Sequence, residues 1–284
     1  MVVRIRLDIA YDGTHFRGWA RQPGLRTVQG TLEDALGRIL GGRPRLVVAG
    51  RTDAGVHAVG QVAHLDLDDA QRTRLLGSRR GTDAPVPALA RRVGGALGAY
   101  SDVAVRASSV APDGFDARFS AVWRRYEYRV ADRRSGYDPL RRHDTTTVRA
   151  DLDAAVMDAA ARSLRGLHDF AAYCKPRPEA TTIRTLLDFA WHRDDDGVLV
   201  AAVRADAFCH SMVRALVGGC VAVGEGRLAV DDLAAIRDRG ERVPEVKVLA
   251  ARGLTLTEVG YPEDDQLAAR ADQTRARRGG EQID

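Results

Sequence analysis

The sequence contains almost no lysine and little cysteine. Lys175 and Lys247 are its only lysines, and the other 41 basic residues are arginines. The three cysteines, Cys174, Cys209 and Cys220, are far apart and form no C-x-x-C pair. This spacing argues against a disulfide framework or a structural zinc site, so we expect the cysteines to be small buried hydrophobic residues.

A long apolar run is also missing. Arg, Asp or Gly interrupts every apolar stretch before it reaches the roughly 20 residues that a membrane-spanning helix needs. The N-terminal residues 1–8 alternate apolar side chains with Arg4 and Arg6, which is typical of a strand and unlike a secretory signal. We therefore expect a cytoplasmic protein without a membrane segment.

The remaining composition is that of an ordinary globular protein. The chain has 284 residues, of which 45% are hydrophobic and 29% charged. This length suits one large or two modest domains around a real core. The net charge of +4 permits an anionic partner such as nucleic acid without requiring one.

Hydrophobic periodicity predicts strands and helices mixed in both halves of the chain. In the first half we expect strands at 2–10, 46–49, 61–67, 103–110 and 123–130, helices at 27–40 and 88–97, and an exposed excursion at 68–87. In the second half we expect a helix at 152–164 behind an Asp151 N-cap, strands at 183–193, 197–205 and 253–259, and helices at 209–223 and 230–239.

This order predicts an α+β fold with two similar halves, each a mainly antiparallel sheet backed by helices. Residues 1–131 would form the N-terminal half and residues 132–261 the C-terminal half. The last segment, 262–284, is polar and charged with little apolar content, so we expect it to be disordered.

The most informative stretch is Gly50-Arg51-Thr52-Asp53-Ala54-Gly55-Val56-His57-Ala58, which lies between two expected strands. Its glycines allow backbone conformations that hold the Arg51 and Asp53 side chains in unusual directions. The alternative interpretation is an ordinary turn in which Asp53 bonds to its own backbone. Composition and spacing alone favour that alternative.

The stretch resembles the central motif of the tRNA pseudouridine synthase A family, and the resemblance continues across nearly the whole chain. The further matching motifs are Tyr11-Asp12-Gly13-Thr14-x-Phe16-x-Gly18-Trp19, Thr27-Val28-Gln29-Gly30-x-Leu32-Glu33, Phe115-x-Ala117-Arg118-Phe119-Ser120-Ala121, Arg124-Arg125-Tyr126-Glu127-Tyr128, Gly166-x-His168-Asp169-Phe170, Phe208-x-His210-x-Met212-Val213-Arg214 and Gly253-Leu254-x-Leu256. The chain departs from the family pattern at Ala20, at Cys209 and Ser211, and at 249–250. None of these departures touches a residue expected to be catalytic.

The resemblance implies a ferredoxin-like or RRM-like arrangement of the two halves, with the active-site cleft between them. It also implies isomerisation of uridine to pseudouridine at positions 38–40 of the tRNA anticodon stem-loop, by a homodimer without a cofactor. The reaction breaks the C1′–N1 bond, turns the uracil over and rejoins it through C5. The essential carboxylate carried over is Asp53, the expected nucleophile; attack on a carbon centre, stabilisation of the sugar cation and removal of a sugar proton all remain open.

Four other residues are carried over as parts of the site. The resemblance implies that Arg214 is the partner of the Asp53 carboxylate. Arg214 also lies in an otherwise apolar helical stretch, where an unpaired guanidinium is costly, so we expect some acidic group to meet it. Tyr126 would pack against the target uracil, Arg51 would hold the flipped nucleotide out of the stem, and Leu254 would form an apolar wall. Without the resemblance, Tyr126 would more simply be a core residue. For Arg214 the alternative interpretation is a side chain that faces solvent, with His210 one turn earlier.

Other candidate ligands give weaker signals. His57, His168 and His210 lie in separate motifs without the short spacings of zinc sites, so we expect no metal. Arg17, Arg21 and Arg26 near the first loop are candidates for phosphate contacts.

Two other classes of function remain as alternatives. A non-catalytic RNA-binding protein on the same scaffold would not need Asp53. A nucleoside or glycoside hydrolase would need a second acidic residue as general acid, and no motif offers one.

Overall fold

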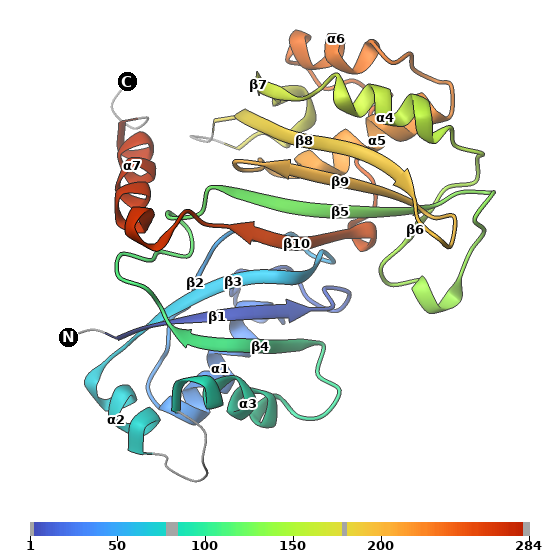
Figure 1. Cartoon of the computed structure of the whole chain (residues 1–284). Helices are drawn as coiled ribbons and strands as arrows, with labels where there is room; N and C mark the ends of the chain where they lie inside the picture. Colours follow the sequence, from blue (N-terminus) through green and yellow to red (C-terminus); the bar gives the residue numbers. More distant parts are fainter. Residues whose placement is uncertain (1–2, 78–84, 178–180, 281–284) are drawn as a thin grey trace. The chain divides into compact units, whose positions relative to one another are not determined.

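The computed structural model describes residues 3–77, 85–177 and 181–280. The chain divides into two compact units. The first unit comprises Met1–Val122 together with Glu258–Asp284, and the second comprises Trp123–Thr257. Each unit carries its own strands and helices (Figure 1).

The first unit is built on an antiparallel sheet. Its strands are β1 (Val3–Tyr11), β2 (Val47–Val48), β3 (His57–Leu67) and β4 (Val103–Val110). β1 lies between β3 and β4, and β2 pairs with β3. Alternate side chains of β1, at Ile5, Leu7 and Ile9, are fully buried, which is the period-2 pattern that predicted this strand.

Helices α1 (Val28–Leu40) and α3 (Pro85–Leu97) lie along one face of this sheet (Figure 1). Thr27 caps α1, because its side chain accepts a hydrogen bond from the backbone N–H of Gly30. The expected excursion at 68–87 is wrong in its first part, where α2 (Asp69–Gly77) forms a helix. Gln71 and Leu75, four residues apart, give that helix a buried stripe too narrow to be recognised in the sequence. Residues 78–84 of the predicted excursion lie outside the described residues.

The second unit has its own antiparallel sheet. Its strands are β5 (Trp123–Ala131), β6 (Thr146–Thr147), β7 (Gly166–Asp169), β8 (Ile183–Arg193) and β9 (Leu199–Ala205). β9 pairs with β5 and β8, and β7 pairs with the outer edge of β8. The short β6 runs parallel to β5.

The helices of the second unit are α4 (Ala154–Arg162), α5 (Met212–Gly224) and α6 (Asp232–Arg239). α5 is buried over almost its whole length, as its nearly unbroken apolar sequence predicts. α4 begins later than expected, because Asp153 rather than Asp151 accepts hydrogen bonds from the first free backbone N–H groups.

The cysteines are not all free. Cys174 and Cys209 form a disulfide that closes a loop with a sequence separation of 35, whereas Cys220 is a buried free thiol. The expectation that the cysteines form no disulfide is therefore wrong for this pair, although Cys174 is buried as expected. The sequence did not indicate this pair, because the two cysteines are far apart in the chain and strands β8 and β9 lie between them.

β10 (Leu254–Gly260) contains the boundary between the units. The other boundary falls at 122/123, before β5, and not after it as the predicted division at 131/132 requires. The reason is pairing: β5 forms its ladder with β9, so it belongs to the second unit. A change in composition along the chain does not reveal such a pairing.

Over residues 262–280 the predicted disorder of the tail is also not what the structure has, because α7 (Leu267–Gly280) forms a helix. The last four residues of that prediction, 281–284, lie outside the described residues. Leu267 and Ala271, one turn apart, are both buried. The Ser120 hydroxyl donates to the Leu267 carbonyl at 3.0 Å, and Arg275 pairs with Asp116 at 2.9 Å. Two apolar side chains and one ion pair dock this helix on the first unit, although the segment as a whole is polar.

The antiparallel strands and separate helices confirm the predicted α+β class. The ferredoxin-like arrangement stays a prediction. Among the residues that the structure describes, no helix is both long and apolar enough to cross a membrane.

Candidate active site

The loop that carries Asp53 connects β2 to β3 in the first unit, and an earlier segment of the chain holds its backbone. The Trp19 N–H donates to the Thr52 carbonyl at 3.0 Å, and the Gly55 N–H donates to the Phe16 carbonyl at 3.3 Å. These two bonds lie on either side of Asp53. The loop is therefore fixed by backbone contacts in front of and behind the catalytic candidate.

Two glycines allow this close approach. A Cβ at Gly13 would lie 2.0 Å from the Val56 carbonyl oxygen, and a Cβ at Gly18 would lie 3.0 Å from the Thr52 carbonyl oxygen. Gly18 also has a φ of +90°, which L side chains rarely adopt. The spacing of glycine in the first motif thus reflects backbone packing against the Asp53 loop.

A network of buried hydroxyl and amide groups supports the loop. The Tyr11 and Thr52 hydroxyls are 2.8 Å apart, and the Gln61 side-chain amide donates to the Tyr11 hydroxyl at 3.2 Å and to the Gly50 carbonyl at 2.9 Å. Burial raises the pKa of Tyr11 to about 12. The Thr52 side chain and the Gly50 carbonyl are thereby tied to strands β1 and β3.

Asp53 and Arg51 differ in exposure. Asp53 is half-buried, and its carbonyl accepts a hydrogen bond from the Val56 N–H at 3.2 Å, which closes a tight turn. Arg51 is exposed and has no ion-pair partner among the residues that the structure describes. The loop therefore presents a half-buried carboxylate on a hydrogen-bonded turn beside an exposed guanidinium.

Tyr126 lies in the second unit, on β5, and only 8% of its surface is exposed. Its ring meets the Phe208 ring edge-on, with the centroids 5.1 Å apart. Phe208 precedes α5, the helix that carries Arg214, so this ring contact links the strand to the start of that helix. Both aromatic residues belong to motifs seen in the sequence, but nothing in the sequence indicated that their rings are in contact.

Arg214 holds another part of the second unit in place. Its Nε–H donates to the Leu249 carbonyl at 2.6 Å, and the Leu249 N–H donates to the Arg214 carbonyl at 3.2 Å. Arg214 is half-buried, and its two terminal nitrogens have no acceptor among the described residues of the second unit. The expected acidic partner is therefore not supplied by its own unit.

The segment that follows Leu249 leads to Leu254. The Tyr128 hydroxyl donates to the Ala250 carbonyl at 2.6 Å, and burial raises the pKa of Tyr128 to about 12. Gly253 packs so closely that a Cβ there would lie 2.7 Å from the Tyr128 ring. Leu254 itself is buried, with 6% of its surface exposed.

The structure thus groups the predicted site residues by unit. Arg51 and Asp53 share one loop of the first unit. Tyr126, Arg214 and Leu254 belong to the second unit, where Phe208, Leu249 and Tyr128 connect them. The sequence analysis named none of these connecting residues as site residues, nor Thr52, although the family motifs contain most of them.

The histidines do not form a metal site in the part of the chain that is described. No group of three or more His, Cys, Asp or Glu side chains within it could hold a metal ion. His57 has a structural contact instead, since its Nδ1 accepts a hydrogen bond from the Gly13 N–H at 3.0 Å.

Comparison with known proteins identifies the family. The family model of tRNA pseudouridine synthase matches residues 160–262. A tRNA pseudouridine synthase A from Leifsonia xyli subsp. xyli is 60% identical over 281 residues, with 97% of both chains covered. The corresponding protein of Frankia casuarinae is 56% identical over 278 residues, covering 97% of this chain and 95% of the relative.

A third relative, tRNA pseudouridine synthase A from Cutibacterium acnes, is 50% identical over 286 residues and covers 99% of this chain. These matches extend through both units, so they include the Asp53 loop as well as the Tyr126 and Arg214 elements. Because the similarity is this high over almost the full length, the chain belongs to the tRNA pseudouridine synthase A family and is an isomerase of the pseudouridine synthase class.

Proposed function

We propose that this protein converts uridine to pseudouridine at positions 38–40 of the tRNA anticodon stem-loop, with Asp53 as the catalytic carboxylate. The observation that carries the proposal is the loop at 50–58, in which backbone hydrogen bonds fix the chain before and after Asp53. A carboxylate on a rigid backbone can be held at reacting distance from the sugar without paying the entropy of ordering a loop.

Asp53 acts as an anion in this proposal. As nucleophile at C1′ it would form a bond to C1′ while the C1′–N1 bond of the uridine breaks and the uracil leaves as an anion. The uracil then turns, and C5 bonds to C1′ while the bond from Asp53 to C1′ breaks. C5 finally loses its proton and N1 gains one, so that the product is an isomer of uridine. Stabilisation of a sugar cation or removal of a sugar proton would also need the ionised form. The three routes therefore share one requirement, a charged carboxylate at the target nucleotide.

Arg214 is the proposed partner of that carboxylate. Its Nε–H donates to the Leu249 carbonyl, whereas its terminal nitrogens have no acceptor among those residues of the second unit that the structure describes. An arginine near a carboxylate favours the charged form and can bind both carboxylate oxygens. Tyr126 would contact the uracil, Arg51 would hold the flipped nucleotide, and Leu254 would line the pocket.

The family resemblance further supports a homodimer that acts on tRNA in the cytoplasm without a cofactor. Light scattering of the purified protein tests the dimer directly. A monomer at every protein concentration would contradict that part of the proposal.

The central experiment compares the wild type with Asp53→Asn on unmodified tRNA transcripts, with pseudouridine mapped at single-nucleotide resolution. We expect wild-type product at positions 38–40, no turnover by the variant, and tRNA affinity within about tenfold of wild type, because binding depends mostly on phosphate contacts. Asp113→Asn, at an exposed position outside the loop, is the matched control.

Pseudouridine formation by the Asp53 variant would overturn the assignment of the carboxylate. Product at other tRNA positions would overturn the anticodon-arm substrate but not the reaction. Binding of tRNA by the wild type without any product would favour the alternative of a non-catalytic RNA-binding protein.

A further inference from the structure

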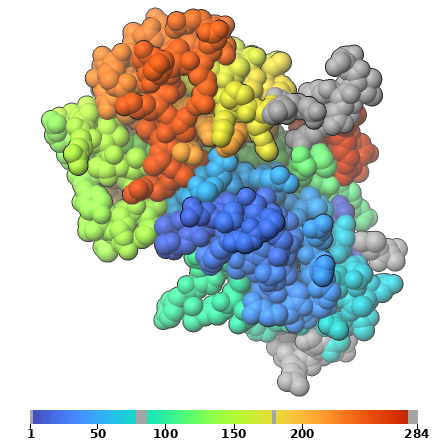
Figure 2. Space-filling view, turned by 180° about the vertical axis from the view of Figure 1, so that it is seen from behind, coloured from blue at the N-terminus to red at the C-terminus, as the bar shows by residue number. Residues whose placement is uncertain are grey.

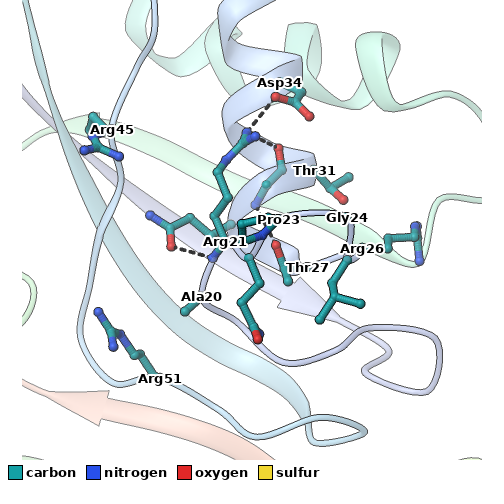
Figure 3. Close-up of a pocket in the computed structure, with 14 residues that line it drawn as sticks. Ala20, Arg21, Pro23, Gly24, Arg26, Thr27, Thr31, Asp34, Arg45 and Arg51 are labelled. Atoms are coloured by element: carbon teal, nitrogen blue, oxygen red, sulfur yellow. Dashed lines mark hydrogen bonds and ion pairs between the residues drawn. The ribbon is translucent and has the colours of Figure 1, made fainter.

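A hollow of about 820 Å³ lies in the first unit beside the loop that carries Asp53 (Figure 3). Its walls are the loop between β1 and α1, the first turns of α1 and the segments that flank β2. The loop between β1 and α1, dark blue, is at the surface in Figure 2. Four arginines line the hollow: Arg21, Arg26, Arg45 and Arg51.

Two of these arginines are already neutralised. Arg21 donates to Glu33 at 3.0 Å and to Asp34 at 2.6 Å. Arg26 binds both carboxylate oxygens of Asp102 at 2.7 Å. The sequence analysis proposed both as phosphate ligands; the structure instead gives them carboxylate partners.

Arg26 is held in a second way. Its guanidinium lies over the Phe16 ring, 4.2 Å from the centroid. The hydrogen bond to Asp102 raises the pKa of the Arg26 guanidinium above its ordinary value. Arg26 is therefore a fixed part of the wall and has little capacity to bind another anion.

The other two arginines are free. Arg45 and Arg51 are exposed, and their guanidinium groups have neither a carboxylate nor another acceptor among the described residues. Both lie along the same side of the hollow, whereas Arg21 points toward Asp34 (Figure 3). The unneutralised positive charge in the hollow thus comes from these two side chains.

The backbone that presents Arg45 is anchored to α1. The Leu46 N–H donates to the Glu33 side chain at 3.0 Å, and the Gln29 side-chain amide donates to the Leu46 carbonyl at 3.3 Å. Glu33 is itself buried, with 6% exposed. The same carboxylate that neutralises Arg21 therefore fixes the backbone next to Arg45.

We propose that this hollow is a subsite for a phosphodiester group of the substrate RNA, in which Arg45 binds the phosphate next to the nucleotide contacted by Arg51. The subsite rests on the proposed function in taking tRNA as the substrate and Arg51 as a residue that contacts the flipped nucleotide. Guanidinium groups match phosphate geometry with two parallel N–H donors. Arg45 is a positioning residue, since it reads no base and does not touch the reacting atoms.

The test measures tRNA affinity for the wild type, Arg45→Gln and Arg72→Gln over a series of salt concentrations. Arg72 is exposed on α2, in the same unit, and does not line the hollow, so both variants lose one charge. For Arg45→Gln we expect the slope of log K against log salt to fall by about 0.7–0.9 and affinity near physiological salt to fall about fivefold. Arg72→Gln should change neither quantity.

Kinetics give an independent measurement. Arg45→Gln should raise KM about fivefold with kcat retained, because a phosphate contact made equally in the ground and transition states affects binding alone. Arg45→Lys should restore the salt slope, since it restores the charge. A merely structural role would lower the melting temperature instead, and charge restoration would leave the salt slope unchanged.

Equal slope changes in the Arg45 and Arg72 variants would overturn the subsite, because they would indicate a diffuse surface effect. An unchanged slope in both would overturn it as well. A free nucleotide is the other source of a phosphate: binding of uridine 5′-monophosphate that Arg45→Gln abolishes, with RNA affinity unchanged, would also contradict the proposal. Failure of pseudouridine formation by the wild type is a separate outcome, since the binding measurement does not depend on turnover.

Discussion

The two units hold their site residues by different means. In the first unit, the Asp53 loop packs backbone against backbone, and the contact depends on Gly13 and Gly18 having no side chain. In the second unit, long side chains reach carbonyl groups, as Arg214 does at Leu249 and Tyr128 does at Ala250. A side-chain atom added at Gly13 or Gly18 would therefore disturb the first unit. Loss of the Arg214 or Tyr128 donor would disturb the second.

The cysteines add to this contrast. All three lie in the second unit, and the disulfide joins the chain after β7 to the residues just before α5. Close by, the Lys175 N–H donates to the His210 carbonyl at 2.9 Å. The second unit thus fixes the start of the Arg214 helix covalently, whereas the first unit fixes its loop by packing and hydrogen bonds alone.

The largest expected effect on stability comes from removing this disulfide. Cys174→Ser should lower the free energy of unfolding by about 3–4 kcal/mol, the chain-entropy estimate for a loop of this length. Hydrogen exchange should locate the loss in the second unit, around α5 and β7. The wild type in a dithiol reductant should behave like the variant.

Two controls belong to this experiment. The reductant should not change the stability of Cys174→Ser, because its disulfide is already absent. Alkylation without reductant should label Cys220 alone after unfolding. Labelling of all three thiols in the unreduced protein would show that the disulfide does not form in solution.

The next effect breaks the packing of the first unit. In Gly13→Ala the new Cβ would collide with the Val56 carbonyl oxygen, a backbone atom that cannot swing aside. We expect a loss of about 3 kcal/mol in the free energy of unfolding, together with reduced turnover, because the Asp53 loop must move. Thermal melts and pseudouridine assays measure the two effects.

Gly24→Ala is the matched control for this substitution. Gly24 has a φ of +69°, but a Cβ there would meet nothing within 4 Å. Its cost should be about 1–2 kcal/mol, from the backbone conformation alone. Equal losses in the two variants would mean that close packing at Gly13 is not what fixes the loop.

This difference between the units also decides what the sequence could predict. Most strands and helices follow from apolar periodicity, as β1 and α5 do, since their buried faces are local patterns. The glycines of the Asp53 loop are visible because close packing leaves a motif. The family resemblance then predicts site residues in both units.

The remaining features depend on contacts between distant residues. The ion pairs of Arg21 and Arg26, the bond from Arg214 to Leu249 and the disulfide each join positions that no local pattern relates. The docking of α7 is similar, because it depends on Ser120 and Asp116 far earlier in the chain. Periodicity identifies a buried face but does not identify its partner.

A smaller effect tests the side-chain contacts of the second unit. Arg214→Lys should lower kcat/KM about 100-fold, because an ammonium cannot donate to the Leu249 carbonyl and also present two parallel donors to a carboxylate. Stability should fall by only about 1 kcal/mol, the worth of one hydrogen bond. Steady-state kinetics and thermal melts separate the two effects, and near-wild-type kinetics would remove Arg214 from the site.

The smallest expected effect is a loss in the free energy of unfolding at alkaline pH, to which a buried tyrosine in each unit contributes. Burial raises the pKa of Tyr11 in the first unit to about 12, and that of Tyr128 in the second unit to about 12. An unfolded tyrosine titrates near pH 10, so between about pH 10 and 12 the unfolded chain loses its protons first. The free energy of unfolding must therefore fall as the pH rises through this window, having been fully maintained below it.

Replacing one of these tyrosines should remove the part of the alkaline loss in unfolding free energy that this tyrosine causes. In Tyr11→Phe, the fall in stability between pH 9 and 11 should be smaller than in the wild type by about 1 kcal/mol, the linkage expected halfway through such a shift. The near absence of lysine makes this measurement clean, since only Lys175 and Lys247 add ammonium groups that titrate in the same range. Tyr100→Phe, at a fully exposed ring, is the control.

Urea titrations at each pH give the free energies. Because the comparison uses the change with pH, the hydrogen bonds that Tyr11→Phe loses at neutral pH do not enter it. The same alkaline loss in the Tyr11 and Tyr100 variants would mean that the hydroxyl network beneath the Asp53 loop is open to water. A reduced loss in Tyr11→Phe alone would mean that this network excludes water, as burial of the Tyr128 hydroxyl leads us to expect for its contact in the second unit.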